Sequence, residues 1–525
     1  MKKQVSFILG LFLLPFTLLA QDNYWQQELK YNIVAKLDTT SKKITASQSI
    51  IYKNNSDKTL DFIWFHIYPN AYKNKQTAMM QQIINDASRT EKLGEIDYGS
   101  MVSCNFSTDG KKLSTSPHEN ASYIDIIKVH LAKPLEPGKS TTINSEFTVK
   151  LPSYFSRSGY ADGEFMVTQW YPKPAVFDKD GWHEFPYLDM GEFYSEYADY
   201  TVSITIPSNL IIGATGVLQT KEELDQYKSI GRKNTENKTG KPALYQPNKT
   251  ATKTLTYTAQ HVPDFAWFAA PDMVIQYDTI QLATKNVDAF SFYHHKQKTI
   301  WNKSIDYIKD ATRKYSQWIG EYQYPTVQAY EGPKNNASGG MEYPMITLIT
   351  SPDANPERLD EVITHEVGHN WFMSMLGSNE RMHTWQDEGL NSYFENRYMA
   401  EKYRSNSIFG ESIPANLKKL PTEEFQRLIY NAMKQIPMNS KIDQPSANFS
   451  TSEDYAITSY YKASMWVYGL EAKYGRKLVD EAFQLYFKKW HGKHVSPKDL
   501  QKAFEEVTGD NLDQYFNKLN TVGAL

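Results

Sequence analysis

Apolar and polar residues alternate along much of the first half of the chain, as they do in half-buried β-strands. Residues 44–52 alternate in this way up to a turn-forming segment at residues 54–56. Similar runs cover residues 200–206 and 254–259. Short strands separated by turns predict an all-β, sandwich-like domain. Residues 221–253 are rich in Lys, Asn, Thr and Gly, and we predict that they form a solvent-exposed hairpin or loop.

A different pattern follows residue 271. Residues 299–319 carry apolar side chains three or four positions apart, which predicts a helix, whereas residues 327–330 and 345–349 have the composition of strands. Another helix is predicted at residues 462–473. A last one is predicted to begin at Ser496-Pro497, where the serine caps the helix and the proline takes its first position. The second half is therefore predicted to be a mixed sheet followed by helices.

The length of the chain indicates how many domains it forms, and its charge indicates which partners are excluded. A chain of 525 residues is too long for one compact core, so we expect a β domain at residues 21–271 and a mixed α/β domain at residues 272–525. The fold class is thus α+β multidomain. The formal net charge of -3 gives no basic excess, and we expect no nucleic-acid partner.

The N-terminus has the features of a secretory signal peptide, which we predict at residues 1–20. Two lysines precede an almost unbroken apolar run at residues 5–19, and Ala20 is suitable for cleavage. The alternative is a membrane anchor, but the run is short for a span and contains Pro15. We therefore expect export to the periplasm or the extracellular space, with no stable membrane span after the signal is removed.

The candidate chemistry begins with an H-E-x-x-H motif at residues 365–369. Asn355-Pro356 supplies a cap and a first-turn proline for a helix through the motif. On a helix, His365 and His369 lie on one face and can hold one Zn²⁺, and Glu366 can act on a water at the metal. The alternative is a helix that carries a histidine pair on a polar face.

Glu388 follows His369 after eighteen intervening residues, enough for a loop and a returning helix. It would complete a set of two histidines and one glutamate for one Zn²⁺ per chain, with the fourth position open for water. A structural zinc site usually has four protein ligands, often cysteines, and this chain has one cysteine. Glu395 lies on the same helix face as Glu388 and could accept a hydrogen bond from a zinc-bound imidazole. An ordinary helix-face glutamate is the alternative for Glu395.

Four segments together resemble the aminopeptidase N family of zinc metallopeptidases, which belongs to the gluzincin clan. The first two are H-E-x-x-H and W-x-D-E-G-L at residues 385–390, which contains Glu388. The third, Gly339-Gly340-Met341-Glu342-Tyr343, resembles G-x-M-E-N, and the fourth, Tyr460-Tyr461-Lys462-Ala463, resembles Y-x-K-G. The chain is identified as a short, bacterial-type member that lacks the family's large C-terminal helical domain. The resemblance implies an N-terminal β domain followed by a thermolysin-like catalytic domain.

The resemblance also implies roles for individual residues. Tyr460 would donate a hydrogen bond to the oxyanion of the tetrahedral intermediate. Glu342 would bind the free ammonium group of the substrate, and Gly339, Gly340 and Met341 would line the substrate site.

Two segments of the β domain extend the resemblance. Residues 185–189 resemble an F-P-x-x-D segment, and residues 168–171 occupy the place of T-Q-x-E. The last residue of T-Q-x-E helps to hold the substrate amine in the family. Here that residue is Tyr171, so the second amine anchor has no matching residue.

The leading hypothesis is a secreted or periplasmic zinc aminopeptidase that acts on peptides with free N-termini, with Glu366 as general base. Two alternatives use the same scaffold for catalysis, namely a zinc endopeptidase and a hydrolase of another electrophile such as an epoxide. A third alternative is a non-catalytic peptide-binding relative. Such a relative would be expected to lack a zinc ligand or the glutamate base, and this sequence has both.

Overall fold

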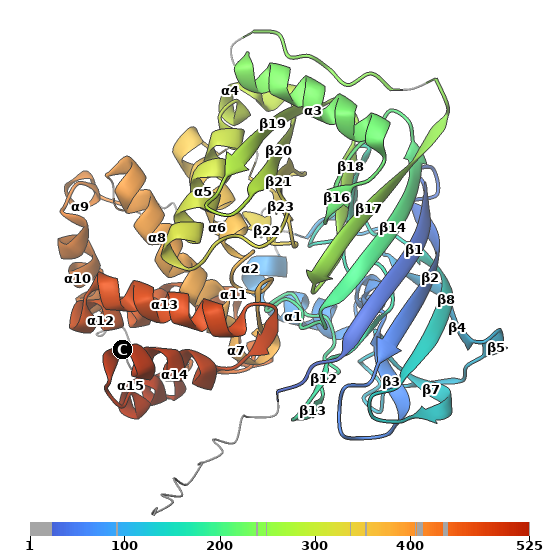
Figure 1. Cartoon of the computed structure of the whole chain (residues 1–525), viewed down its shortest axis with the longest axis horizontal. Helices are drawn as coiled ribbons and strands as arrows, with labels where there is room; N and C mark the ends of the chain where they lie inside the picture. The colour runs from blue at the N-terminus through green and yellow to red at the C-terminus, as the bar shows by residue number, and fades with distance from the viewer. Residues whose placement is uncertain are drawn as a thin grey trace, which may run out of the picture.

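The structure, a computed structural model, describes residues 24–523 except for residues 91–92, 238–239, 248, 336–337, 352–353, 405, 407–412 and 434–438. The signal peptide predicted at residues 1–20 lies outside the described residues. The described chain forms a β-rich part, blue to green in Figure 1, and a second part of sheet and helices, yellow to red. The predicted α+β fold class is therefore confirmed. No helix within the described ranges is long and apolar enough to cross a membrane.

An eight-stranded sheet forms one face of the β-rich part. Its strands, in spatial order, are β16 (Val217–Leu218), β17 (Thr252–Val262), β14 (Ala198–Pro207), β1 (Glu28–Asp38), β2 (Lys43–Lys53), β8 (Ser140–Lys150), β4 (Ser100–Thr108) and β5 (Lys111–Lys112). β1 pairs in parallel with β14 and antiparallel with β2. In β2, buried and exposed residues alternate as the sequence predicts.

This part also contains the two-stranded sheet of β12 (Phe177–Asp178) and β13 (Gly181–Trp182) and two four-stranded sheets. One contains β15 (Ile211–Ala214), β18 (Trp267–Ala270), β10 (Glu164–Val167) and β9 (Gly159–Ala161). The other contains β11 (Lys173–Pro174), β3 (Leu60–His66), β7 (Ile126–Leu135) and β6 (Thr115–Pro117). Their buried residues join those of the large sheet in one hydrophobic core, which continues into the second part of the chain.

The second part is built on a five-stranded sheet. Its order is β19 (Met273–Gln281), β20 (Asn286–His294), β21 (Thr326–Glu331), β23 (Ile346–Ile349) and β22 (Gly340–Met341). The predicted strands at residues 327–330 and 345–349 correspond to β21 and β23. Side chains of β21 reach β15 of the other part, since Gln328 donates to the Ala214 carbonyl at 2.8 Å and Tyr330 to the Ile211 carbonyl at 3.0 Å.

Helices cover this sheet and carry the predicted site. α5 (Ser304–Trp318) packs against α6 (Pro356–Gly368), and α6 packs against α8 (Glu388–Tyr403). α14 (Pro497–Thr508) begins with the predicted Ser496-Pro497 cap. α6 and α8 therefore bring the H-E-x-x-H motif and Glu388 together.

The prediction of a loop or hairpin at residues 221–253 is wrong for its first half. α3 (Lys221–Glu236) lies across β19 at the top of Figure 1. Although α3 is mostly polar, a narrow stripe along one side of the helix is buried and includes Tyr227 and Ile230. Asn234 also donates to the Ile275 carbonyl at 2.8 Å, so tertiary contacts hold a helix that the composition does not suggest.

The single helix predicted at residues 299–319 is interrupted. α4 (Lys298–Trp301) ends before α5 begins at Ser304. Gln276 of β19 donates to the Asn302 carbonyl at 3.0 Å in the gap between the two helices. This contact satisfies a backbone acceptor that a continuous helix would have used.

Candidate active site

α6 begins as the sequence predicts, because the Asn355 side chain accepts a hydrogen bond from the backbone N–H of Arg358 at 2.9 Å. The helix ends at Gly368, and His369 follows with φ of -64° and ψ of -11°, still in the right-handed helical region. His369 therefore lies one turn below His365. Asn391 of α8 donates to the His365 carbonyl at 2.8 Å and ties the two helices together.

Three ligand atoms converge between α6 and α8. Nε2 of His365 and Nε2 of His369 are 3.1 Å apart, and Oε2 of Glu388 lies 3.3 and 3.2 Å from them. This oxygen is buried and has no hydrogen-bond partner among the described residues. A nitrogen–nitrogen–oxygen set this compact fits a divalent cation such as zinc, which would take the lone pairs that point toward one another.

Two carboxylates hold the outer nitrogens of the imidazoles. Nδ1 of His365 lies 2.8 Å from Glu395 Oε2, and Nδ1 of His369 lies 2.5 Å from Asp387 Oδ1. Carboxylates there accept Nδ1–H and leave Nε2 available for a metal. Burial disfavours a charge on His365, but Glu388 and Glu395 outweigh burial and raise the pKa of the imidazole to about 10. The same negative field attracts a metal cation.

Glu366 and Glu342 are two further carboxylates close to this ligand set. Both side chains are buried, and burial raises the pKa of Glu366 to about 7. Burial also raises the pKa of Glu342 well above its usual range. Oε1 of Glu342 has no hydrogen-bond partner among the described residues, although a carboxylate oxygen of Glu342 lies within 4.8 Å of ligand atoms of His369 and Asp387. The site therefore holds a carboxylate ready for an external partner.

Three of the four predicted substrate residues line the pocket, and the fourth does not. Gly339, Gly340 and Glu342 line the pocket. Met341 differs from the prediction, because it lies in the hydrophobic core. Successive side chains of a strand point to opposite faces, so Gly340 and Met341 cannot face the pocket together. Tyr343, which stands in place of the family's Asn, is also buried in the core.

Of two adjacent tyrosines, Tyr460 faces the ligand set and Tyr461 faces away. Tyr460 donates its hydroxyl hydrogen to Glu388 Oε1 at 2.5 Å, and its ring stacks on His365 with centroids 5.9 Å apart. Tyr461 lies in an apolar cluster with Met465 and Tyr468. Both belong to a π-helical turn, Ile457–Lys462, that leads into α12 (Ala463–Tyr474). The helix predicted at residues 462–473 is thus preceded by the turn that carries Tyr460.

Gly389 allows this turn to approach α8. A Cβ atom on Gly389 would lie 2.3 Å from the Cβ atom of Ala463 and 2.8 Å from the Ser459 carbonyl oxygen. Only glycine avoids this overlap, so the close contact that sets Tyr460 beside Glu388 depends on Gly389.

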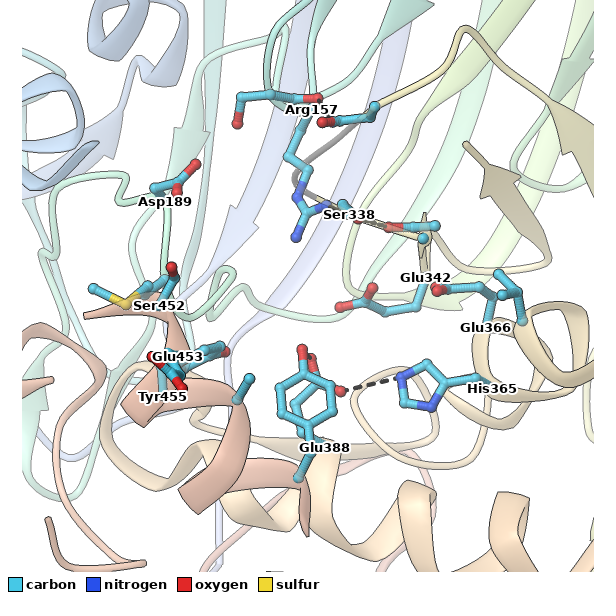
Figure 2. Close-up of a pocket in the computed structure, with 18 of the residues that line it drawn as sticks. Arg157, Asp189, Ser338, Glu342, His365, Glu366, Glu388, Ser452, Glu453 and Tyr455 are labelled. Carbon is cyan, nitrogen blue, oxygen red and sulfur yellow. Dashed lines mark hydrogen bonds and ion pairs between the residues drawn. The ribbon is translucent and has the colours of Figure 1, made fainter. Parts of the chain in front are cut away.

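A pocket of about 380 Å³ lies between the two parts of the chain (Figure 2). Of the residues described above, it is lined by Gly339, Gly340, Glu342, His365, Glu366, Glu388, Glu395 and Tyr460. The β-rich part contributes Arg89, Arg157, Asp189 and Met190 to its wall. Asp189 belongs to the predicted F-P-x-x-D segment and receives two hydrogen bonds from Arg89, at 2.8 and 2.7 Å. The pocket is therefore completed by the β-rich part.

Tyr171 does not reach this pocket. It is fully buried, and its hydroxyl donates to Asp264 Oδ1 at 2.7 Å in the interior of the β-rich part. Gln169, from the same segment, donates to Asp264 Oδ2 at 2.7 Å. Neither side chain can serve as a second amine anchor in this arrangement.

Several residues near the site were not predicted. Asp387 immediately precedes a predicted ligand within W-x-D-E-G-L, and this position could have drawn attention to it. Arg157 and Glu192 form an ion pair at the pocket wall, and Tyr455 lines the pocket. These three lie in segments without a recognisable motif, so only the tertiary structure identifies them.

Comparison with known proteins agrees with this site. A model of the peptidase family M1 domain matches residues 303–519. Leucine aminopeptidase 2 of Chaetomium globosum is 27% identical over 205 residues, which are 38% of this chain and 32% of that protein. A leukotriene A-4 hydrolase homolog of Botryotinia fuckeliana is 28% identical over 206 residues, which are 36% of this chain and 29% of that protein. The chain thus spans about a third of the length of these curated relatives.

Among solved structures, a mutant of the M1 zinc metallopeptidase from Deinococcus radiodurans, bound to a Tyr-Ser-Ala substrate, has a similar fold. The TM-score is 0.61 at 15% identity, and the match covers 95% of each chain. The similarity extends over both parts of the fold, whereas the family match lies in the part that contains the ligand set. Residues 303–519 of this chain are thus similar to the peptidase family M1 domain.

Proposed function

We propose that this protein is a zinc-dependent aminopeptidase that removes N-terminal residues from peptides. The observation that carries the proposal is Glu342, a buried carboxylate with an unpaired oxygen close to the predicted zinc ligands. An N-terminus differs from internal backbone by one positive charge, and a buried carboxylate is a strong partner for it. The names of the aminopeptidase relatives and the peptide bound to the Deinococcus protein support the same reading.

In this proposal His365, His369 and Glu388 hold one zinc ion per chain, with Glu395 and Asp387 orienting the imidazoles. When bound, zinc supplies Lewis acidity and lowers the pKa of a water from about 15.7 to about 7. Export follows from the signal peptide predicted at residues 1–20, to the periplasm or the extracellular space.

The protein's own side chains then carry out the proton transfers. Glu366 accepts a proton from the attacking water and delivers it to the leaving amine. A raised pKa suits this double task, because a group with a pKa near the working pH can both accept and release a proton. Tyr460 donates a hydrogen bond to the oxyanion that develops in the transition state.

The test is a comparison of matched peptides. Free-amine peptides should be cleaved and their N-acetylated counterparts should be poor substrates, and a chelator should abolish turnover. Efficient internal cleavage of blocked peptides would indicate an endopeptidase, and turnover only of an epoxide would indicate the other hydrolase. Binding of peptides without any turnover, in zinc-loaded protein, would support a non-catalytic role.

A further inference from the structure

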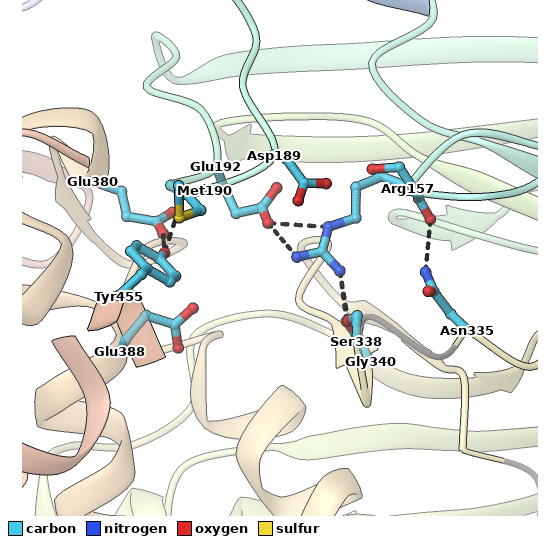
Figure 3. A network of polar contacts seen from close by, with 12 residues as sticks. Arg157, Asp189, Met190, Glu192, Asn335, Ser338, Gly340, Glu380, Glu388 and Tyr455 are labelled. Atoms are coloured by element: carbon cyan, nitrogen blue, oxygen red, sulfur yellow. Dashed lines mark hydrogen bonds and ion pairs between the residues drawn. The ribbon is translucent and has the colours of Figure 1, made fainter. Parts of the chain in front are cut away.

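Arg157 joins the β-rich part to the loop that carries Glu342 (Figure 3). Its Nη1 donates to Ser338 Oγ at 2.5 Å and to the Gly340 carbonyl at 3.2 Å. Next to it, Asn335 donates to the Ser156 carbonyl at 3.0 Å. The start of β22 is therefore held in place from the other side of the pocket.

Glu192 holds the rest of the guanidinium. Nε and Nη2 of Arg157 both donate to Glu192 Oε1, at 3.0 and 2.5 Å. The side chain of Glu192 is 5% exposed and that of Arg157 is 19% exposed. Arg157 lines the pocket and Glu192 lies behind it, so a substrate meets the guanidinium and not the carboxylate.

Arg157 and Glu342 are within electrostatic reach of each other. Burial opposes a charge on Arg157, but Glu192 favours it most strongly, followed by Tyr187 and Glu342, and they hold the pKa of the guanidinium above its ordinary value. In Figure 2 the guanidinium extends past Ser338 toward the side of the pocket where Glu342 lies. An unpaired buried carboxylate and a nearby guanidinium are natural partners.

This proximity creates a competition. If Arg157 turned to Glu342, the protein's own cation would occupy the carboxylate that the substrate ammonium needs. In the structure, Nε and Nη2 of Arg157 are instead bound to Glu192. Removal of Glu192 would leave a half-buried, partly unpaired guanidinium, which would then gain from pairing with Glu342.

We propose that Glu192 keeps Arg157 away from Glu342, so that Glu342 remains available to the substrate ammonium, while Arg157 fixes the Gly340 carbonyl. Arg157 and Glu192 are positioning residues. The inference rests on the proposed function, because it assigns ammonium binding to Glu342.

The experiment compares a single with a double variant. Glu192→Gln frees Arg157, whereas Arg157→Met combined with Glu192→Leu removes both charges at similar volume. Each is made in zinc-loaded Glu366→Gln protein, and binding of the tripeptide Leu-Gly-Gly and of its N-acetylated form is measured by calorimetry. KM is measured in the corresponding enzymes with Glu366 intact.

Glu192→Gln should weaken binding of the free-amine peptide at least tenfold and leave the N-acetylated peptide unaffected. The double variant should bind the free-amine peptide more tightly than Glu192→Gln does, because no cation remains to occupy Glu342. If the ion pair had only a structural role, the double variant would bind the free-amine peptide more weakly than Glu192→Gln does, or each variant would lose the same affinity for both peptides. Unchanged binding in Glu192→Gln, or a double variant no better than the single one, would overturn the inference.

A matched ion pair away from the pocket serves as the control. Arg397 donates to Asp480 at 2.6 and 3.1 Å between α8 and α13 (Arg476–Trp490). Arg397→Met combined with Asp480→Leu should not change the difference in affinity between the two peptides. If Glu192→Gln does not fold, Glu192→Asp replaces it and should give a smaller loss in the same direction. If the parent itself does not distinguish the two peptides, the proposed function fails. If the parent does and Glu192→Gln has no effect, only this inference fails.

Discussion

Gly340 of β22 lies directly against Glu366 of α6, so that a Cβ atom on Gly340 would come within 2.5 Å of the Glu366 carboxylate oxygen Oε1. The carboxylate could avoid such an atom only by moving away from its place beside the ligand set. A misplacement of about 1 Å can cost about 10²-fold in rate. Gly340→Ala should therefore lower kcat by about that factor and leave the zinc content unchanged.

Gly339→Ala is the control, because its Cβ atom would meet only ordinary contacts at 3.7 Å. Equal turnover in both variants would contradict the argument.

Removal of zinc should abolish turnover, and added Zn²⁺ should restore it. His365→Ala, His369→Ala and Glu388→Ala should each lower the bound metal, which elemental analysis measures. Zinc binds the folded state, so the chelated protein should also unfold at a lower temperature. Protein that contains no zinc and works equally well after chelation would exclude the zinc site.

Glu366→Gln and Tyr460→Phe should retain zinc and lose turnover. The glutamine cannot accept the proton of the water, so most of kcat should disappear. Loss of the Tyr460 hydroxyl should lower kcat by about 10²–10³ if it donates to the oxyanion. Tyr461→Phe is the matched control and should change kcat little, since Tyr461 packs in the apolar cluster. A large effect in Tyr461→Phe alone would reverse the assignment.

Glu342→Gln keeps the shape of the side chain and removes its charge. Hydrogen bonds to charged groups contribute about 1.5–3 kcal/mol, so KM for free-amine peptides should rise about tenfold to a hundredfold. The small activity toward N-acetylated peptides should not change. Equal losses for both kinds of peptide would mean that Glu342 does not recognise the ammonium group.

Asp86 ties the β-rich part to the segment that carries Tyr460. Its Oδ2 accepts the backbone N–H of Ser452 at 2.7 Å, at the start of α11 (Ser452–Ala456). Burial opposes its charge, but hydrogen bonds from Ser452 and Ser88 outweigh burial and lower the pKa of Asp86 to about 2. A lowered pKa in the folded state stabilises the fold above the unfolded-state value of about 3.9, and this contribution is lost as the pH falls through about 2.

The free energy of unfolding of Asp86→Asn should thus be lower than that of wild type by a constant amount from about pH 7 to pH 5, and the difference should shrink toward about pH 2. Chemical denaturation of both proteins at several pH values measures it. A difference that does not depend on pH would show that the charge of Asp86 contributes nothing.

Local spacing allowed much of the site to be predicted. The spacing of His365 and His369 determines that both lie on one helix face, and the cap at Asn355 locates the start of that helix. The alternation in β2 likewise reports its buried face directly. These features depend on neighbours in the chain, which is why a sequence alone reveals them.

The features that were missed depend on contacts between distant segments. α3 is held on β19 partly by the hydrogen bond from Asn234 to the Ile275 carbonyl, which no local pattern records. Arg157 reaches the Gly340 carbonyl across 183 positions of the chain. Met341 was misplaced for a different reason: the motif groups it with its neighbours, whereas the alternation of β22 separates it from them.

The continuous core also bears on how a substrate of the proposed kind would reach the pocket. Gln328 and Tyr330 of β21 bond to the backbone of β15, and buried residues of both parts pack together without interruption. A rotation of one part against the other would break these contacts. Under the proposed function, the size of an acceptable peptide then depends on the shape of the pocket entrance rather than on closure of one part over the other.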